Sequence, residues 1–193
     1  MKRLFDLTLA VFSLVLFFLW LFPLVAIAIK LSSKGPVFFK QLRHGKDNVP
    51  FYCYKFRTMI MNRNADTQQA RRNDRRITQI GRMLRKTSID ELPQIINVIR
   101  GEMSIVGPRP HTVPMNNIFS KEIGNFMFRH SVKPGITGLA QSKGFRGEIK
   151  DFFEIHSRYK LDMFYVKKWG LYLDSKIVIR TMHTLLFKND KAY

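Results

Sequence analysis

The hydrophobic and polar positions divide the chain into one long apolar segment and a mixed remainder. The apolar segment is Leu7–Ile29, which only Thr8, Ser13 and Pro23 interrupt. As one α-helix, its 23 residues would extend about 34 Å, enough to cross the hydrocarbon core of a bilayer. Three interpretations fit such a segment: a transmembrane anchor, a cleaved signal peptide, and a re-entrant hairpin that enters and leaves the membrane on one face.

The charges on either side of this segment favour the hairpin. Lys2 and Arg3 precede it and several basic residues follow it, so the positive-inside tendency places both flanks on the cytoplasmic side. A straight helix cannot satisfy both flanks. A helix broken at Pro23 can, because proline lacks a backbone N–H and its ring clashes with the preceding turn. The signal peptide fits less well, since Asp6 interrupts its basic start.

The pattern that follows the apolar segment predicts a small sheet. Gly35 and Pro36 mark a turn, and Val37–Gln41 has the composition of a short strand. Phe51–Thr58 is a second candidate strand, rich in aromatic residues. Because only the polar loop His44–Pro50 separates the two, we expect them to pair as an antiparallel hairpin.

Most of the remaining chain has helical character. Asn62–Lys86 is polar and dense in arginine, and we expect a helix followed by a loop there. A helix with one buried face is expected after residue 91, ending at Gly101. The residues expected on that buried face are Leu92, Ile95, Ile96 and Ile99.

Further elements are expected towards the C-terminus. The last helix has a broad apolar side with basic residues between, and it fits either the membrane interface or the core. The expected segments are an apolar connection at Met103–Val106, turns within Lys133–Gln141, and helices at Met115–His130, Ile149–Lys168 and Ile177–Phe187. The fold class is therefore α+β and mostly helical, with residues 1–33 as a membrane element and residues 34–193 as one further domain.

Composition narrows the partners. The chain has 33 Lys and Arg against 14 Asp and Glu, a formal net charge of +19. Such a charge requires an anionic partner: nucleic acid, an anionic membrane surface or a polyphosphate substrate. The single cysteine, Cys53, excludes an internal disulfide and a multi-cysteine metal site, and the five histidines have no metal-ligand spacing.

The most informative stretch is Thr87–Pro110, which contains the carboxylate pair Asp90 and Glu91 at the expected start of a helix. Two caps are compatible with it: a capping box of Ser88 with Glu91, or Asp90 as the cap with Pro93 in the first turn. We favour the second, because the first places Pro93 deeper in the helix. A helix N-terminus also binds phosphate, and a divalent cation would be needed to offset the repulsion between phosphate and carboxylates.

Basic residues near this pair suit a phosphate ligand. Arg109 lies between Pro108 and Pro110, which restrict its backbone and lower the entropy lost when the guanidinium binds a phosphate. Lys55 and Arg57 are two residues apart on the second strand, so they are expected on one face. A carboxylate facing a rigidly held arginine is suited to chemistry on a phosphate.

Together, several motifs resemble one known family. They are KFRTM, TSIDELPQIINVIRGEMSIVGPRP, KPGITGLAQ and LDMFYVKKW. In combination they resemble the catalytic core of the bacterial sugar transferases, which are membrane-bound polyprenyl-phosphate phosphoglycosyl transferases. The resemblance covers essentially the whole chain. It implies a proline-broken re-entrant membrane helix with its hinge at Pro23, a small antiparallel β-hairpin, and amphipathic interfacial helices around the active site.

The resemblance also implies a reaction. The family transfers a sugar 1-phosphate from a UDP-sugar to undecaprenyl phosphate, giving undecaprenyl-diphospho-sugar and UMP. By this resemblance, Asp90 is the nucleophile that forms an aspartyl-phosphosugar intermediate, and Glu91 is its partner. Both carboxylates are expected to bind Mg²⁺. The residues expected to contact substrate are Arg109, Lys55, Arg57, Arg85, Asp162 and Tyr165.

The expected setting is the bacterial inner membrane, with a monotopic protein whose catalytic domain lies on the cytoplasmic face. The expected partners are a UDP-sugar, which the resemblance implies to be a UDP-hexose, undecaprenyl phosphate and anionic phospholipids, without nucleic acid; a homodimer stays open. Two alternatives are kept. One is a membrane-tethered nucleic-acid-binding module that uses the arginine-rich residues 63–86, and the other is a glycosyl transferase that releases UDP.

Overall fold

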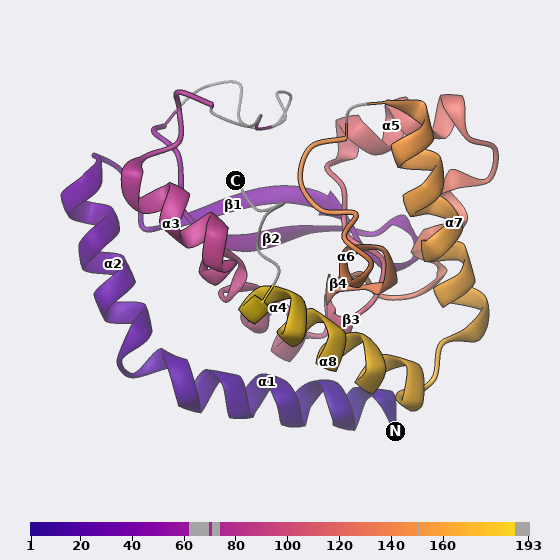
Figure 1. Cartoon of the computed structure of the whole chain (residues 1–193), viewed down its shortest axis with the longest axis horizontal. Helices are drawn as coiled ribbons and strands as arrows, with labels where there is room; N and C mark the ends of the chain where they lie inside the picture. The colour runs from indigo at the N-terminus through magenta and orange to yellow at the C-terminus, as the bar shows by residue number, and fades with distance from the viewer. Residues whose placement is uncertain (62–69, 71–73, 150, 188–193) are drawn as a thin grey trace.

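The computed structural model describes residues 1–61, 70, 74–149 and 151–187 of the chain. At the N-terminus, α1 (Lys2–Phe18) and α2 (Leu21–Ser32) form a pair bent by 60°. In Figure 1 this pair borders the molecule, with α1 along the lower edge and α2 along the left. No single described helix has the length and apolar composition to cross a membrane, whereas the bent pair has both when taken together.

The bend lies one turn before the predicted hinge. The helix is interrupted at Leu19 and Trp20, and Pro23 falls in the first turn of α2. Proline cannot donate to the carbonyl four residues earlier, so the interruption precedes it by about that distance. The Trp20 indole N–H donates to the Leu16 carbonyl oxygen at 2.5 Å and satisfies an acceptor at the end of α1.

The predicted antiparallel hairpin is confirmed. Strand β1 (Phe38–His44) pairs with β2 (Pro50–Phe56), and a 3₁₀ turn at Lys46–Asn48 joins them. Strand β1 runs past its predicted end at Gln41, and β2 starts before its predicted start at Phe51, because the ladder pairs His44 directly with Pro50. Only a short loop therefore remains between the strands.

Helix α4 (Gln94–Arg100) attaches to the hairpin through one buried amide. The fully buried Asn97 side chain donates to the Tyr52 carbonyl oxygen at 2.7 Å and accepts from the Tyr54 N–H at 3.0 Å. Because Asn97 faces inward, the predicted buried face is only partly right. Ile95 is buried as expected, but Ile99 is exposed.

Two expectations about helices were wrong. The described end of the arginine-rich segment is the helix α3 (Gln79–Thr87), where a loop was expected; residues 62–69 and 71–73 lie outside the described chain. The single helix expected at Met115–His130 is instead α5 (Val113–Glu122) and a 3₁₀ helix (Phe126–Ser131). Asn125, with φ at 60°, separates them in the left-handed region, which an α-helix cannot continue through.

A second, very small sheet was not anticipated. Strand β3 (Ser104–Val106), expected as a plain connection, pairs in parallel with β4 (Gly135–Thr137). Three residues are too few to show a strand periodicity in the sequence. The later helices are α6 (Leu139–Ser142), α7 (Phe152–Lys168) and α8 (Leu171–Phe187).

The bent pair packs against the rest of the fold along one side. In α1, Ala10 lies in a buried cluster with Cys53 of β2 and Val98 of α4. In α2, Phe22 and Ile29 lie in a second cluster with Phe56 and Leu84. The opposite side exposes large apolar residues: Leu4, Val11, Phe12, Val15, Leu16, Phe18, Leu19, Trp20, Leu24, Ile27 and Leu31.

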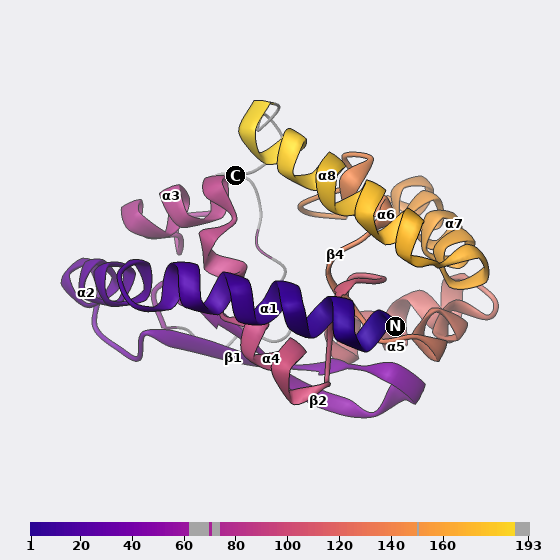
Figure 2. The same cartoon turned by 90° about the horizontal axis from the view of Figure 1, so that it is seen from below.

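Polar contacts tie the start of α1 to the C-terminal half. The Lys2 ammonium lies 2.6 Å from the fully buried Asp174 carboxylate of α8 and also donates to the Val106 carbonyl oxygen. The Arg3 guanidinium donates to the carbonyl oxygens of Val98 and Ile99 at the end of α4. Figures 1 and 2 both place the N-terminus beside the start of α8.

The end of α2 is tied to the same body. The buried Arg57 guanidinium donates to the carbonyl oxygens of Lys34 and Ser33 at 2.7 Å each, and to that of Ile29 at 3.3 Å. Ser33 and Lys34 directly follow the last residue of α2, so Arg57 holds the chain where this helix ends. Both ends of the bent pair are therefore fixed to one folded unit.

We predict that Lys2→Met lowers the free energy of unfolding by about 3 kcal/mol, because it leaves the buried Asp174 carboxylate without its counter-charge. Denaturation of the purified protein in detergent measures this. Lys176→Met on α8 is the matched control, since Lys176 is exposed, and its effect should stay within about 0.5 kcal/mol. Equal losses in the two variants would show that the Lys2 ion pair does not stabilise the fold.

Candidate active site

The predicted carboxylate pair lies in a tight turn between two helices. Ser88 ends α3 in the left-handed region, with φ at 58°, and Asp90 and Glu91 follow in a 3₁₀ turn, Ile89–Glu91. Neither predicted cap is formed. The Ser88 side chain makes no cap hydrogen bond, and the residue before α4 is Pro93, not Asp90, because α4 begins only at Gln94. The turn instead directs Glu91 towards basic residues from other segments.

Glu91 joins two of the predicted phosphate-binding residues. Its Oε1 lies 2.6 Å from the Lys55 ammonium of β2 and 2.6 Å from Nη2 of Arg109. Arg109 also donates from Nη1 to Oε2 at 3.2 Å, so the contact is bidentate. Three residues from distant parts of the sequence thus meet at one carboxylate.

The electrostatics of the two carboxylates differ. Burial alone would raise the pKa of Glu91, but the charges and hydrogen bonds of Arg109 and Lys55 outweigh it and hold that pKa well below its usual range. Burial raises the pKa of Asp90 to about 6; the charge of Lys55 opposes this rise and that of Glu91 adds to it. The same carboxylate, Glu91, raises the pKa of Arg109.

The Asp90 side chain is buried, but its carboxylate forms no hydrogen bond with the described residues. Its exposed fraction is 7%, and within the described residues no group donates a hydrogen bond to its carboxylate. Its oxygens are not among the fully enclosed polar atoms without a partner, so the carboxylate keeps lone pairs that an electrophile or a cation can reach. Asp90 therefore has the environment of a reactive group, whereas Glu91 has that of a fixed one.

Backbone contacts place Arg109. Strand β3 leads into Gly107, whose N–H donates to the Thr137 carbonyl oxygen of β4 at 2.9 Å. A Cβ at Gly107 would lie 2.4 Å from the Lys133 carbonyl oxygen, and one at Gly138 would lie 2.2 Å from the Gly107 carbonyl oxygen. Only glycine allows this approach. The segments GPRP and KPGITG therefore pack backbone to backbone and together orient the loop that carries Arg109.

The structure brings Arg85 near the site but not Arg57. Arg85 donates from Nε to the Thr58 hydroxyl at 2.9 Å, and its charge acts to lower the pKa of Asp90. Lys55 bonds Glu91, whereas Arg57 donates to the carbonyl oxygens of Ser33 and Lys34, so the expected joint phosphate-binding face does not form. Arg57 holds the end of α2, as described above, and does not contact the carboxylate pair.

Asp162 and Tyr165, expected to contact substrate, both have protein partners. Asp162 forms a buried ion pair with Arg129 at 2.6 Å. The Tyr165 hydroxyl donates to the Val106 carbonyl oxygen at 2.9 Å and contacts Asp174 at 2.7 Å. Tyr165 therefore helps to hold the start of α1 through Lys2. Asp162 is linked to the Arg109 loop through Arg129.

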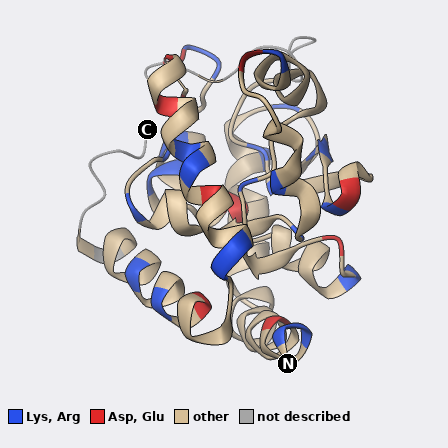
Figure 3. Cartoon of the chain, turned by 90° about the vertical axis from the view of Figure 1, so that its right-hand side faces the viewer, with Lys and Arg blue, Asp and Glu red and all other residues tan. Residues whose placement is uncertain are grey.

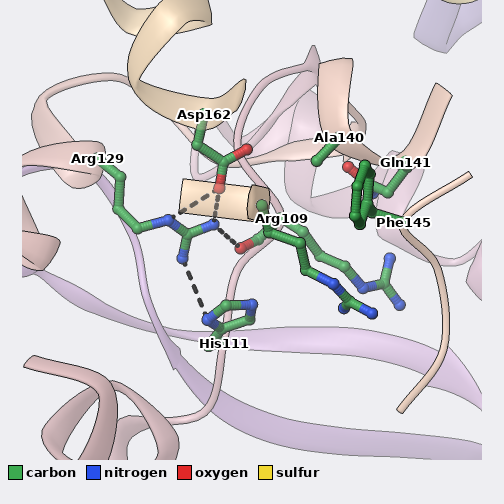
Figure 4. A pocket seen from close by; sticks show the side chains of 8 residues that line it. Arg109, His111, Arg129, Ala140, Gln141, Phe145 and Asp162 are labelled. Carbon is green, nitrogen blue, oxygen red and sulfur yellow. Dashed lines mark hydrogen bonds and ion pairs between the residues drawn. The ribbon is translucent and has the colours of Figure 1, made fainter. Parts of the chain in front are cut away.

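Three arginines near the site were not predicted. Arg43 and Arg146 lie close enough to Arg109 and Glu91 for these charges to act on their pKa values, which burial lowers. Arg129 lines a small cavity with Arg109, as Figure 4 shows. The only signal for it in the sequence is a charged residue within the aromatic run Phe126–Phe128 and His130.

The site has an excess of positive charge. Lys55 and Arg109 bond the fixed carboxylate of Glu91, and Arg43 and Arg146 lie close enough for its charge to raise their pKa values against the larger lowering by burial. Figure 3 shows the same imbalance over the described chain, where Lys and Arg are distributed widely and Asp and Glu are fewer. The arrangement is thus suited to a ligand with several negative charges.

The carboxylates provide a limited set of metal ligands. Within the described residues, no group of three or more His, Cys, Asp or Glu side chains is placed to hold a metal ion. Mg²⁺, however, is commonly held by one or two carboxylates together with substrate phosphates and water. The free oxygens of Asp90 fit that pattern.

Comparison with known proteins gives a consistent picture. The sequence model of the family described as bacterial sugar transferase matches residues 1–188. A UDP-glucose:undecaprenyl-phosphate glucose-1-phosphate transferase of Xanthomonas campestris pv. campestris is 49% identical over 185 residues, covering 93% of this chain and 37% of that protein. The chain thus spans little more than a third of that relative's length.

Two further relatives differ in length and in the sugar they are named for. A protein of the same name from Caulobacter vibrioides is 44% identical over 193 residues, covering 100% of this chain and 72% of that protein. A UDP-N-acetylgalactosamine-undecaprenyl-phosphate N-acetylgalactosaminephosphotransferase of Aeromonas hydrophila is 42% identical over 189 residues, covering 96% and 43%.

The two carboxylates should affect stability in opposite directions. The pKa of Asp90 is raised from 3.8 to about 6, so the folded protein binds this proton more tightly than the unfolded chain. Stability is therefore lost as the pH rises from about 4 to about 6. Asp90→Asn removes that cost and should raise the free energy of unfolding at pH 8 by about 1–3 kcal/mol, an advantage that shrinks towards pH 4.

Glu91→Gln is the paired variant with the opposite sign. Its depressed pKa means that the ionised carboxylate stabilises the fold above the ordinary value of 4.5. Removing the charge leaves Lys55 and Arg109 unpaired and should cost about 3 kcal/mol at pH 8. Denaturation of both variants in detergent with a chelator, from pH 4 to 8, measures the pair. Destabilisation by Asp90→Asn at pH 8 would show that Asp90 is held by partners.

Proposed function

Because the chain belongs to the bacterial sugar transferase family, we propose that it transfers a sugar 1-phosphate from a UDP-sugar to undecaprenyl phosphate and releases UMP. The observation that carries the proposal is the contrast between the two carboxylates. Asp90 is buried without a hydrogen-bond donor in the described chain, while the adjacent Glu91 is held by Lys55 and Arg109. A free carboxylate beside a fixed, positively charged frame suits attack on a diphosphate.

The reaction proceeds in two displacements. A carboxylate oxygen of Asp90 attacks the sugar-bearing phosphorus of the donor, and the bond to the bridging oxygen breaks, so UMP leaves with the electron pair. A phosphate oxygen of undecaprenyl phosphate then attacks the same phosphorus. This releases the Asp90 carboxylate and forms undecaprenyl-diphospho-sugar. At neutral pH, above its raised pKa of about 6, Asp90 is mostly ionised and ready to attack.

Glu91 acts through the groups that it fixes. It holds the Arg109 guanidinium by one edge, and the remaining N–H groups of Arg109, whose side chain is 31% exposed, are free to reach a donor phosphate. Lys55 contributes a second positive charge to the same place. These cations attract the diphosphate and stabilise the negative charge that develops on it.

Mg²⁺ is part of the proposal. Asp90 and Glu91 would provide its protein ligands, with Asp90 the more available because both Glu91 oxygens already accept hydrogen bonds. When bound, Mg²⁺ neutralises phosphate charge and assists departure of the nucleotide.

Glucose is the first sugar to test. The relatives from Xanthomonas and Caulobacter are named for UDP-glucose, whereas the one from Aeromonas is named for UDP-N-acetylgalactosamine. We propose that this chain uses UDP-glucose, with exopolysaccharide or another glycan as the downstream product.

We further propose that the bent pair α1–α2 is re-entrant in the cytoplasmic membrane. Its start is fixed by Lys2 and Arg3, and its end by Arg57, to one folded unit. Two ends bound to one body cannot lie on opposite sides of a bilayer. The exposed apolar side of the pair would enter the lipid, and α8 adds an exposed apolar face with Ile179 and Met182.

The reaction is tested by the nucleotide released. Purified protein with undecaprenyl phosphate, Mg²⁺ and a panel of UDP-sugars should release UMP with UDP-glucose, and chelation of Mg²⁺ should stop it. Asp90→Asn should fall below about 0.1% of the wild-type rate, because it removes the attacking oxygen. Glu122→Gln, an exposed carboxylate on α5, is the control and should be unchanged. UDP release would indicate a glycosyl transferase, and full activity in Asp90→Asn would refute the nucleophile.

The membrane topology is tested by labelling. A cysteine inserted after Met1 and one at Lys34→Cys mark the two ends of the bent pair. A membrane-impermeant maleimide should label both only after spheroplasts are opened. The wild-type chain is the control, because its buried Cys53 should not react in either condition. Labelling of the N-terminal cysteine in intact spheroplasts would show a single crossing.

A further inference from the structure

We propose that the buried ion pair Arg129–Asp162 is a positioning device that holds Arg109 against Glu91 and the donor phosphates. This inference rests on the proposed function, since Arg109 is taken to bind the donor. Arg129 and Asp162 contact neither carboxylate of the pair in the hydrogen bonds and ion pairs described. They act through the backbone of the Arg109 loop.

Arg129 contacts three groups at once. Its exposed fraction is 1%, and its Nε and Nη2 donate to Oδ2 of Asp162 at 3.0 and 2.6 Å. Nη2 also donates to the Arg109 carbonyl oxygen at 2.7 Å, and Nη1 lies 3.3 Å from Nδ1 of His111. Figure 4 shows these contacts converging on one guanidinium at the wall of the cavity.

His111 accepts in this arrangement. Burial, with the charge of Arg129 next, holds its pKa well below the usual range, so the ring is neutral. A neutral ring with its proton on Nε2 offers Nδ1 as the acceptor for Arg129. Arg129 therefore donates to both the carbonyl of Arg109 and the side chain two residues later.

A second arginine holds the next carbonyl. Arg43 of β1 donates from Nη1 to the Pro110 carbonyl oxygen at 2.5 Å. Pro108 and Pro110 have no N–H, so this loop offers few donors of its own and is fixed through its carbonyls. Arg129 and Arg43 thus hold the two successive peptide units that directly follow the Cα of Arg109.

Stability alone does not account for the ion pair. Burial raises the pKa of Asp162 despite the opposing charge of Arg129, which reflects the cost of enclosing the carboxylate. Buried ion pairs are often no more stabilising than apolar residues of equal size. What an apolar pair lacks is a planar fork that joins a carboxylate on α7 to a backbone carbonyl at a fixed angle.

The effect on Arg109 follows from short distances. Nη2 of Arg109 lies 2.6 Å from Glu91, so a displacement of the loop by about 1 Å would break this contact, and errors of that size can lower rates by about 100-fold. Asp162 orients Arg129, Arg129 fixes the Arg109 backbone, and Arg109 presents its guanidinium to the donor.

The test begins with Arg129→Lys. Lysine keeps a positive charge for Asp162 but cannot form the fork to the Arg109 carbonyl. We expect the KM for UDP-glucose to rise and kcat/KM to fall by about tenfold or more, with the KM for undecaprenyl phosphate within about twofold. Asp162→Asn should act in the same direction. Asp151→Asn is the control, because this exposed carboxylate at the start of the same helix α7 contacts only the Glu154 N–H in the hydrogen bonds described, and it should keep the wild-type KM for the donor.

A double-mutant cycle separates positioning from general destabilisation. The dissociation constant of UDP is measured by calorimetry for wild type, Arg129→Lys, Arg109→Ala and the double variant. If Arg129 acts through Arg109, its replacement weakens UDP binding by about tenfold in the wild-type background and less than about twofold beside Arg109→Ala. Equal weakening in both backgrounds, or none in the first, would overturn the inference.

The same measurements separate this inference from the proposed function. A wild-type protein that releases UMP while Arg129→Lys behaves like it refutes the positioning role alone. A wild-type protein that neither binds UDP nor releases UMP refutes the proposed function, and the positioning role is refuted with it.

Discussion

Two adjacent and largely buried carboxylates cannot both be left without a counter-charge, and this electrostatic constraint organises the structure around them. Asp90 and Glu91 repel each other, and burial penalises the charge of both. The fold places Lys55 and Arg109 on Glu91 alone. Glu91 therefore has fixed partners, whereas the Asp90 carboxylate forms no hydrogen bond with the described residues and its pKa is raised. The partners of Glu91 therefore decide that Asp90 is the carboxylate that remains available.

The constraint reaches far along the chain because the two cations come from different segments. Lys55 requires the hairpin in register, which Asn97 fixes from α4. Arg109 requires the backbone contact between β3 and β4, which Gly107 makes possible. Only Leu92 and Pro93 separate the 3₁₀ turn that carries the carboxylates from α4. An error in any of these elements would therefore appear first as a loose Glu91 and a misplaced cation.

The sequence predicts which residues meet at the site better than it predicts the elements that hold them. The pair Asp90-Glu91 and the arginine between two prolines are local patterns, and the structure brings them together with Lys55. The hairpin was also visible, because aromatic strands joined by a short polar loop have a local signature. Strands of three residues, such as β3, have none. The prediction that Arg57 contacts substrate was not supported, because the sequence pattern of a basic residue at the end of a strand is the same whether it binds a ligand or holds the end of a helix. The role of Asp162 depends on Arg129, 33 residues away, and such a pairing cannot be read from one sequence.

The N-terminal pair would connect this site to the proposed lipid acceptor. Ala10 packs on Cys53 and Ile95, and Phe22 packs on Phe56. Phe56 adjoins Lys55 in β2, and Ile95 lies one helical turn after Glu91. The side of α1–α2 that faces the protein therefore supports the elements that carry the site, while its other side exposes apolar residues. Insertion of that exposed side into lipid would bring the carboxylates to the membrane surface, where the phosphate of a polyprenyl chain lies. Since polar contacts fix both ends of the pair, the depth to which it inserts would also determine the position of the site.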